Sequence, residues 1–209
     1  MKTDFHGALS AVQPRIRLSR NYDQRQHGYM GYALAMRGRI GGVERAFSVG
    51  IGPGAQQKLA LQAGDALEGE AEAVADARLE PVEFYKAVKL RVPARAPQQP
   101  AATVPPWRGV PPALDVYRAR GHRRLAEEVF AAGACTQCIW GCRMPVDIVT
   151  DPWKPAERQH RFEVFCYGPK TCPVYRAGPP RTVPGRGSAV WTEDDAVDAA
   201  ATAHRGPDE

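Results

Sequence analysis

Short runs of apolar and alternating residues dominate the first half of the chain. Residues 29–38 and 43–52 are largely apolar and are bounded by glycines, which is typical of β-strands. Residues 64–76 and 83–92 alternate between apolar and polar positions, so each run has one apolar face if it is extended. The pattern therefore predicts four strands within the first 95 residues.

Three carboxylates follow this alternation. Glu68, Glu70 and Glu72 recur with a period of two and therefore share one face of a strand. Lys89 and Arg91 have the same spacing on the next predicted strand, where they can pair with these acids across the sheet. We expect a solvated charged face here, with no acid–base or metal chemistry.

A short helix is expected between the second and third of these strands, at residues 52–65. Pro53 suits the first turn of a helix and Gly64 suits its end. Several short strands interrupted by one small helix resemble an OB-fold barrel. Residues 1–95 are therefore expected to form a small OB-like β-barrel.

The second half of the chain has a different organisation. Residues 96–112 are rich in proline, which favours an extended linker. Residues 113–134 have helical spacing broken by glycine and predict one broken helix or two short ones. Two β-prone runs joined by a polar turn then predict a hairpin within the module 113–176. Residues 177–209, rich in proline, glycine and charge, are expected to form an extended, mobile tail.

Composition and charge indicate the cellular compartment of the protein and the class of partner that it can bind. No apolar run approaches the roughly 20 residues that span a bilayer, and the first residues lack a signal-peptide core. We therefore expect a cytoplasmic protein with no membrane contact. The net charge of +5 leaves a polyanionic partner possible. Reduced thiols are expected in the cytoplasm, and an odd number of cysteines also argues against a complete disulfide set.

All five cysteines lie between residues 135 and 172. Cys135 and Cys138 form a Cys-x-x-Cys pair before the predicted hairpin, and Cys166 and Cys172 follow it. This order resembles a zinc ribbon, in which the hairpin brings two cysteine pairs to one tetrahedral ion. The resemblance implies Zn²⁺ bound by these four residues, with Cys142 spare or an alternative ligand.

An iron–sulfur cluster stays open as the alternative cofactor. Three clustered cysteines and a remote Cys-Pro pair are partly similar to ferredoxin-type 4Fe–4S ligation. The gap of five residues between Cys166 and Cys172 is also wider than a usual zinc knuckle. With either cofactor, we expect a chain that is mainly β with short helices, in which a small OB-like barrel is followed by a metal-stabilised β-hairpin module.

Catalysis is not expected. Four thiolates close a metal site, whereas a catalytic zinc keeps one position for water. No serine lies in a nucleophile-elbow context, and no small-molecule substrate is indicated. A non-enzymatic binding protein is therefore the expectation.

Basic and aromatic side chains surround the cysteines and suggest the partner. Cations neutralise phosphates and aromatic rings stack on unpaired bases, so single-stranded or structured nucleic acid is the first expectation. The residues expected to contact it are Arg123, Arg124, Trp140, Arg143, Arg161, Tyr167, Lys170 and Arg176. The alternatives are an accessory or scaffold subunit of a larger protein complex and an iron–sulfur electron-transfer subunit.

Overall fold

The computed structural model describes residues 2–97, 104–151, 153–154 and 156–207. The chain is mainly β. The N-terminal elements are β1 (Lys2–Arg20), β2 (Arg25–Ile40), β3 (Val43–Ile51), α1 (Pro53–Leu59), β4 (Ala66–Ala73) and β5 (Phe84–Ala94). The later elements are α2 (Leu114–Arg120), β6 (Arg123–Arg124), α3 (Glu127–Ala131), the 3₁₀ turn η1 (Cys135–Gln137), β7 (Gly141–Val149), β8 (Arg158–Cys166), β9 (Arg181–Pro184), β10 (Val190–Glu193) and α4 (Asp195–Ala201).

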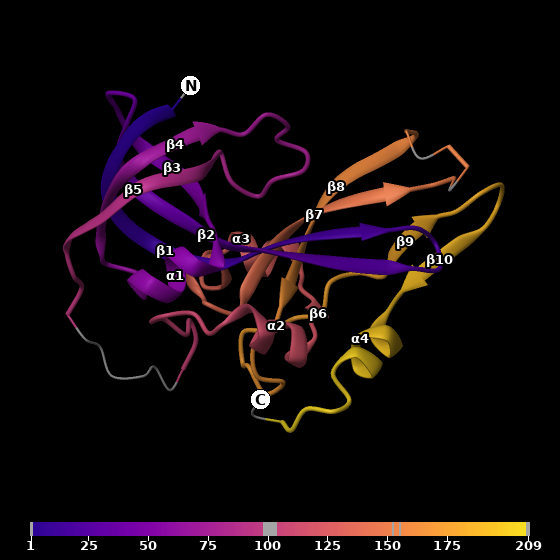
Figure 1. Ribbon diagram of the computed structural model, residues 1–209. Coiled ribbons are helices and arrows are strands. Elements are labelled where there is room, and N and C mark those ends of the chain that lie inside the picture. The colour runs from indigo at the N-terminus through magenta and orange to yellow at the C-terminus, as the bar shows by residue number, and fades with distance from the viewer. Residues whose placement is uncertain (1, 98–103, 152, 155, 208–209) are drawn as a thin grey trace.

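Eight strands form one sheet in the order β2-β3-β5-β4-β1-β7-β8-β6, and β1 also pairs with β2 (Figure 1). This additional pairing means that the first five strands follow one another in a cycle from β2 through β3, β5, β4 and β1 back to β2. The β3–β5 pairing is parallel, at Val49 and Phe84. The four strands predicted from apolar runs and from alternation are confirmed, and so is the helix between the second and third of them.

Strand β1 was not among the predicted elements, although it organises the sheet. Its first half pairs with β4 from Lys2 to Ala8, and it pairs with β2 along nearly its whole length. Gly7 and Gly38 lie opposite each other in the β1–β2 pair. A Cβ atom at either glycine would come within 2.3 Å of a backbone oxygen of the other strand. The two backbones can therefore approach closely only because neither position carries a side chain.

The far half of β1 joins the N-terminal strands to the later ones. Leu18 pairs with Val146 in a parallel β1–β7 contact, which continues to Arg20 and Ile148. One hydrophobic core accordingly contains Ile16 and Leu18 from β1 and Met144 from β7. The two modules expected from sequence thus share a sheet and a core.

The predicted hairpin is confirmed, because β7 and β8 pair antiparallel from Gly141–Cys166 to Val149–Arg158. The predicted pair of short helices corresponds to α2 and α3. Residues 98–103 of the predicted linker lie outside the described residues. The end of the linker contacts the folded chain, since the Trp107 carbonyl accepts a hydrogen bond from the Ile139 amide at 2.9 Å.

The expectation of an extended tail after residue 176 was wrong. β9 and β10 form a hairpin, and α4 follows it. Buried ion pairs hold both parts: Arg20 bonds to Glu193 at 3.1 Å and Arg124 bonds to Asp198 at 3.0 Å. These partners are distant in sequence, so a reading of local composition did not reveal them.

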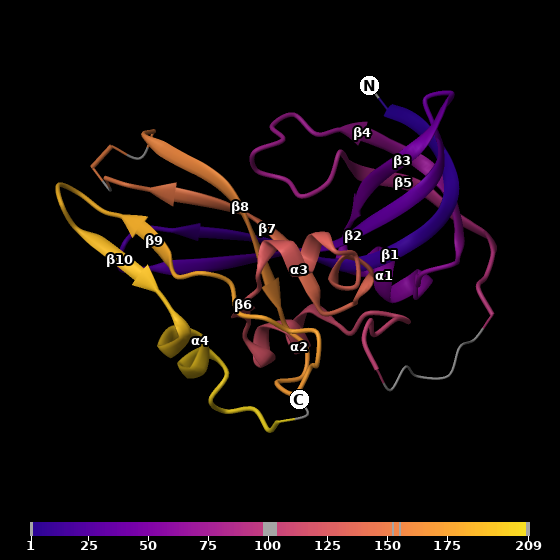
Figure 2. The ribbon, with the colours of Figure 1, turned by 180° about the vertical axis from the view of Figure 1, so that it is seen from behind.

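In Figures 1 and 2 the far half of β1–β2, the hairpin β7–β8 and the hairpin β9–β10 extend to the same side of the molecule. None of the helices in the described ranges combines the length and the apolar character needed to cross a bilayer.

Candidate metal centre

The hairpin β7–β8 brings the predicted ligands to one of its ends. Cys135 lies in η1 and Cys138 directly after it, just before β7 begins at Gly141. Gly141 pairs with Cys166, the last residue of β8. Cys172 lies in the turn that follows, where its amide donates to the Pro169 carbonyl at 3.2 Å. Both cysteine pairs therefore flank the same end of the hairpin.

The two cysteine turns are in direct contact. The Tyr167 amide donates to the Trp140 carbonyl at 2.9 Å. Gly168 backs onto Trp140, where an added Cβ would lie 3.3 Å from the Trp140 Cβ. Gln13 on β1 supports the first turn, because its side-chain amide donates to the carbonyls of Cys135 and Cys138, each at 2.8 Å.

A backbone amide donates to one of the sulfur atoms. The Gly168 amide lies 3.4 Å from Cys166 Sγ. The backbone amides of Trp140 and Trp107 act on the Cys138 thiol, where they oppose the rise of its pKa on burial. Hydrogen bonds of this kind stabilise a thiolate and orient it for a metal ion.

Cys135, Cys138 and Cys166 are buried, Cys172 is half-buried, and the charges of these thiols influence one another. Burial is the main reason that the pKa of Cys135 rises to about 12, and the charges of Cys166, Cys138 and Cys172 add to it. Burial likewise raises the pKa of Cys138 to about 11, with smaller contributions from Cys166 and Cys172. Without a bound cation, Cys135 and Cys138 are therefore protonated at neutral pH.

The structure does not contain a finished metal site. Within the described ranges, no three or more His, Cys, Asp or Glu side chains are grouped so that they could hold an ion. The metal-stabilised module expected from sequence is thus not shown as such. The segments that carry Cys135, Cys138, Cys166 and Cys172 lie at one end of the hairpin.

Cys142 is separate from the other four. Its side chain is fully buried in the main core with Met144 and Tyr167, whereas Cys135 and Cys166 belong to a smaller cluster with Phe130. Cys142 Sγ lies 3.4 Å from the Pro14 carbonyl on β1, to which the thiol donates. That Cys142 is the spare cysteine stays a prediction.

Arg123 lies beside the cysteines. Its guanidinium stacks 3.8 Å above the Tyr175 ring and donates to the Pro169 carbonyl at 2.9 Å. Burial raises the pKa of Cys166, while the Gly168 amide and the Arg123 charge act in the opposite direction. Arg123, expected to contact nucleic acid, is only 8% exposed and instead supports the loop between Cys166 and Cys172.

The other residues expected to contact nucleic acid fall into three groups. Arg124 and Tyr167 are fully buried, so in this conformation they offer no surface to a partner. Trp140, Arg161 and Lys170 are half-buried, and Lys170 donates to the Arg205 carbonyl at 2.8 Å. Arg143 and Arg176 are exposed. The structure therefore does not bring the eight residues together on one surface.

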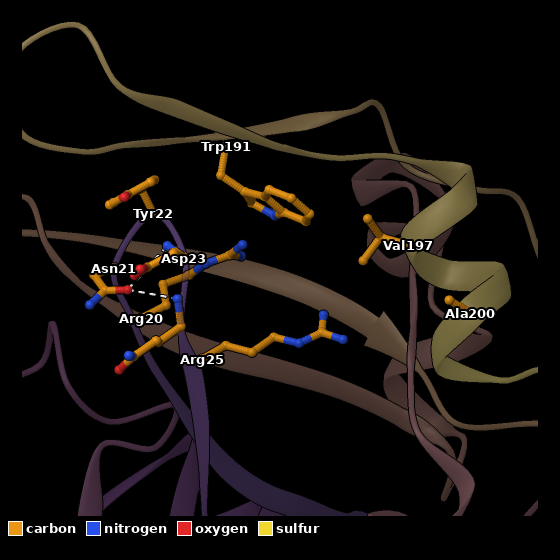
Figure 3. Close-up of a pocket in the computed structure, with 9 residues that line it drawn as sticks. Arg20, Asn21, Tyr22, Asp23, Arg25, Trp191, Val197 and Ala200 are labelled. Atoms are coloured by element: carbon orange, nitrogen blue, oxygen red, sulfur yellow. Dashed lines mark hydrogen bonds between the residues drawn. The ribbon is translucent and has the colours of Figure 1, made fainter.

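A pocket that sequence reasoning missed lies at the far end of the long β1–β2 hairpin. It measures about 290 Å³ and is lined by Arg20, Asn21, Tyr22, Asp23, Gln24, Arg25, Trp191, Val197 and Ala200 (Figure 3). Three separate segments build it: the β1–β2 turn, β10 and α4. No local signal in the sequence marks this pocket, because its lining residues lie at positions 20–25 and 191–200.

Comparison of the chain with protein-family models, with curated proteins and with solved structures returned no match.

Proposed function

We propose that this chain is a non-enzymatic protein that binds single-stranded nucleic acid and that its four gathered cysteines hold a structural zinc ion. The observation that carries the proposal is the connectivity of the first five strands. Three features support the proposal of an OB-like barrel: the cyclic order of these strands, the parallel β3–β5 contact and the position of α1 between β3 and β4. Such barrels commonly bind oligonucleotides or oligosaccharides across the face of their second and third strands.

Cations on the surface favour a polyanion over a neutral sugar. Arg37 and Arg39 are exposed on β2, within the proposed barrel. Arg143 is exposed on β7, and its guanidinium lies 4.1 Å from the centre of the Phe162 ring. Arginine beside an aromatic ring can pair with a phosphate while the ring accepts a base.

The proposed zinc rests on the donor set. Cys135, Cys138, Cys166 and Cys172 would supply the four sulfur ligands of a structural site, with metal–sulfur distances of about 2.3 Å. The sulfur atoms would have to move to a common point for all four to bind the ion. A bound zinc ion would stabilise the thiolates and join the segment 133–141 to the loop after β8. A 4Fe–4S cluster is the rival occupant, and broad visible absorption of the purified protein would identify it.

The nucleic-acid proposal is tested with a fluorescent 12-nucleotide single strand. We expect the untagged protein to bind it at low salt, with an affinity that falls steeply as salt rises because counterions are released. Arg143→Gln should weaken binding several-fold and reduce the salt slope by about one.

Arg78→Gln is the matched control, since Arg78 is exposed but paired with Asp76 at 2.8 Å in the β4–β5 loop. Absence of binding at low salt would overturn the proposal. If the protein fails to bind the oligonucleotide and a protein partner co-purifies with it, the scaffold alternative becomes the better explanation.

A further inference from the structure

The pocket at the far end of β1–β2, here called the tip pocket, has two exposed aromatic residues at its rim. Trp191 is 43% exposed and Tyr22 is 41% exposed. Val197 and Ala200 of α4 form an apolar wall on the side that faces Arg20 and Arg25 (Figure 3). Large aromatic side chains beside an open cavity provide a surface on which a planar ligand can stack.

The rim is held in place by the fold. Tyr22 rests on Gly185, where an added Cβ would lie 2.8 Å from the tyrosine ring. Trp191 is paired with Val183 in the β9–β10 hairpin. Asn21 fixes the β1–β2 turn, because its side-chain oxygen accepts from the amides of Gln24 at 2.7 Å and Asp23 at 3.2 Å. The aromatic residues are therefore presented from ordered elements.

A buried donor points to a ligand with an acceptor. Arg20 lines the tip pocket and is only 4% exposed, and its Nε donates to no residue in the described part of the chain. A buried, unpaired donor is costly unless a ligand or water accepts from it.

The local charge is nearly balanced. Glu193 is fully buried and receives hydrogen bonds from both Arg20 and Arg25 at 3.1 Å, and Asp23 also lines the pocket. Two cations thus face two carboxylates. This balance suits a neutral ring with acceptor atoms better than a free anion.

We propose that the tip pocket holds one unpaired nucleobase of a bound single strand, stacked on Trp191 with an acceptor on its edge facing Arg20 Nε. This assignment rests on the proposed function and names where that function reads a base. A volume of about 290 Å³ is at the lower limit of pockets for drug-sized ligands, which fits one base and part of its sugar. The strand would leave the pocket toward the exposed side of Trp191.

The test compares two 12-nucleotide strands, one of thymidines and one in which every base is replaced by an abasic spacer. Both carry the same backbone charge. We expect the wild-type protein to bind the thymidine strand at least about tenfold more tightly, because stacking of each base on an aromatic ring contributes about 1–3 kcal/mol. Trp191→Ala should remove most of this preference, and Trp191→Phe should retain much of it.

Trp153→Ala is the matched control, since Trp153 is 82% exposed in the β7–β8 turn and lines no part of the tip pocket. Equal affinity of the wild-type protein for both strands would overturn the base pocket while leaving nucleic-acid binding intact. So would unchanged thymidine-strand affinity in Trp191→Ala. Failure of the wild-type protein to bind either strand at low salt would overturn both proposals together.

Discussion

The five cysteines differ in their surroundings far more than in their sequence context. Cys142 is only four residues from Cys138 in the sequence. Because β7 begins at Gly141, Cys142 is part of this strand, and its side chain packs in the main core. The other four stay at the end of the hairpin. A thiol in a packed core behaves as a small hydrophobic side chain. A sulfur atom that accepts a hydrogen bond from a backbone amide is instead stabilised as the thiolate.

This difference predicts opposite effects of two substitutions. Cys138→Ser should abolish the metal content of the purified protein, measured by elemental analysis, and lower its thermal stability because a metal-supported segment loses its ligand. Cys142→Ala should keep the metal and lower the free energy of unfolding by about 1 kcal/mol, the scale of a small cavity in a core. Loss of metal in Cys142→Ala, or full metal content in Cys138→Ser, would contradict the proposed ligand set.

His27 makes stability depend on pH. Burial, with further contributions from the charges of Arg25 and Arg20, lowers the pKa of His27 from 6.5 to about 4, and Glu193 acts in the opposite direction. His122 packs against it with ring centres 4.9 Å apart. Because the unfolded chain binds the proton more readily, the contribution of a neutral His27 is complete above pH 6.5 and is lost as the pH falls to about 4.

We therefore expect His27→Gln to flatten the pH dependence of the unfolding free energy between pH 6.5 and 4, measured by urea denaturation. Part of the slope should survive, since burial also lowers the pKa of His122. His6→Gln, at an exposed position on β1, is the matched control. A slope in His27→Gln equal to that of the wild-type protein would show that protonation of His27 does not oppose folding.

Among the elements, the C-terminal helix shows how a polar tail is held in place. α4 is capped by Asp194, whose side chain accepts from the amides of Ala196 and Val197. Its Asp198 bonds to both the backbone amide and the guanidinium of Arg124, which is completely buried. The same guanidinium also bonds to Asp195, whose side chain is 88% exposed. Two acids of α4, the buried Asp198 and the exposed Asp195, thus neutralise the buried Arg124.

The two acids should not be equivalent. Asp198→Ala should lower the free energy of unfolding by about 3 kcal/mol, because it leaves a buried charge without its buried partner. Asp195→Ala should have a much smaller effect, since the Asp195 side chain is 88% exposed and solvent screens its charge. Urea denaturation of the two variants makes the comparison. Similar losses in both would mean that burial does not make Asp198 the main partner of Arg124.

Apolar runs and alternation predicted four of the five N-terminal strands, but the sequence reasoning missed β1 and the ordered tail for different reasons. In β1, Val12, Ile16 and Leu18 alternate with Gln13, Arg15 and Arg17, so the signal was present, but Pro14 and the high charge argue locally against a strand. In the tail, the stabilising contacts join Arg124 to Asp198 and Arg20 to Glu193. Ion pairs between such distant positions leave no periodic pattern in the sequence.

For the molecule as a whole, sequence spacing predicted a hairpin with a cysteine pair before it and another after it, and the structure contains this hairpin because two adjacent strands form a local structure. It did not indicate the tip pocket, since Tyr22, Trp191 and Val197 come from opposite ends of the chain. Nor did it show that the first five strands and the hairpin β7–β8 belong to one sheet, which depends on the parallel contact between β1 and β7. Composition alone suggested two independent modules there.

The parallel contact between β1 and β7 also bears on how the chain is made. The outer half of β1 leaves the ribosome well over a hundred residues before its partner around Val146. Until then one edge of the long hairpin arm has no partner, and unpaired edges invite association with other chains. Biosynthesis should therefore be the stage at which this protein most needs protection from aggregation.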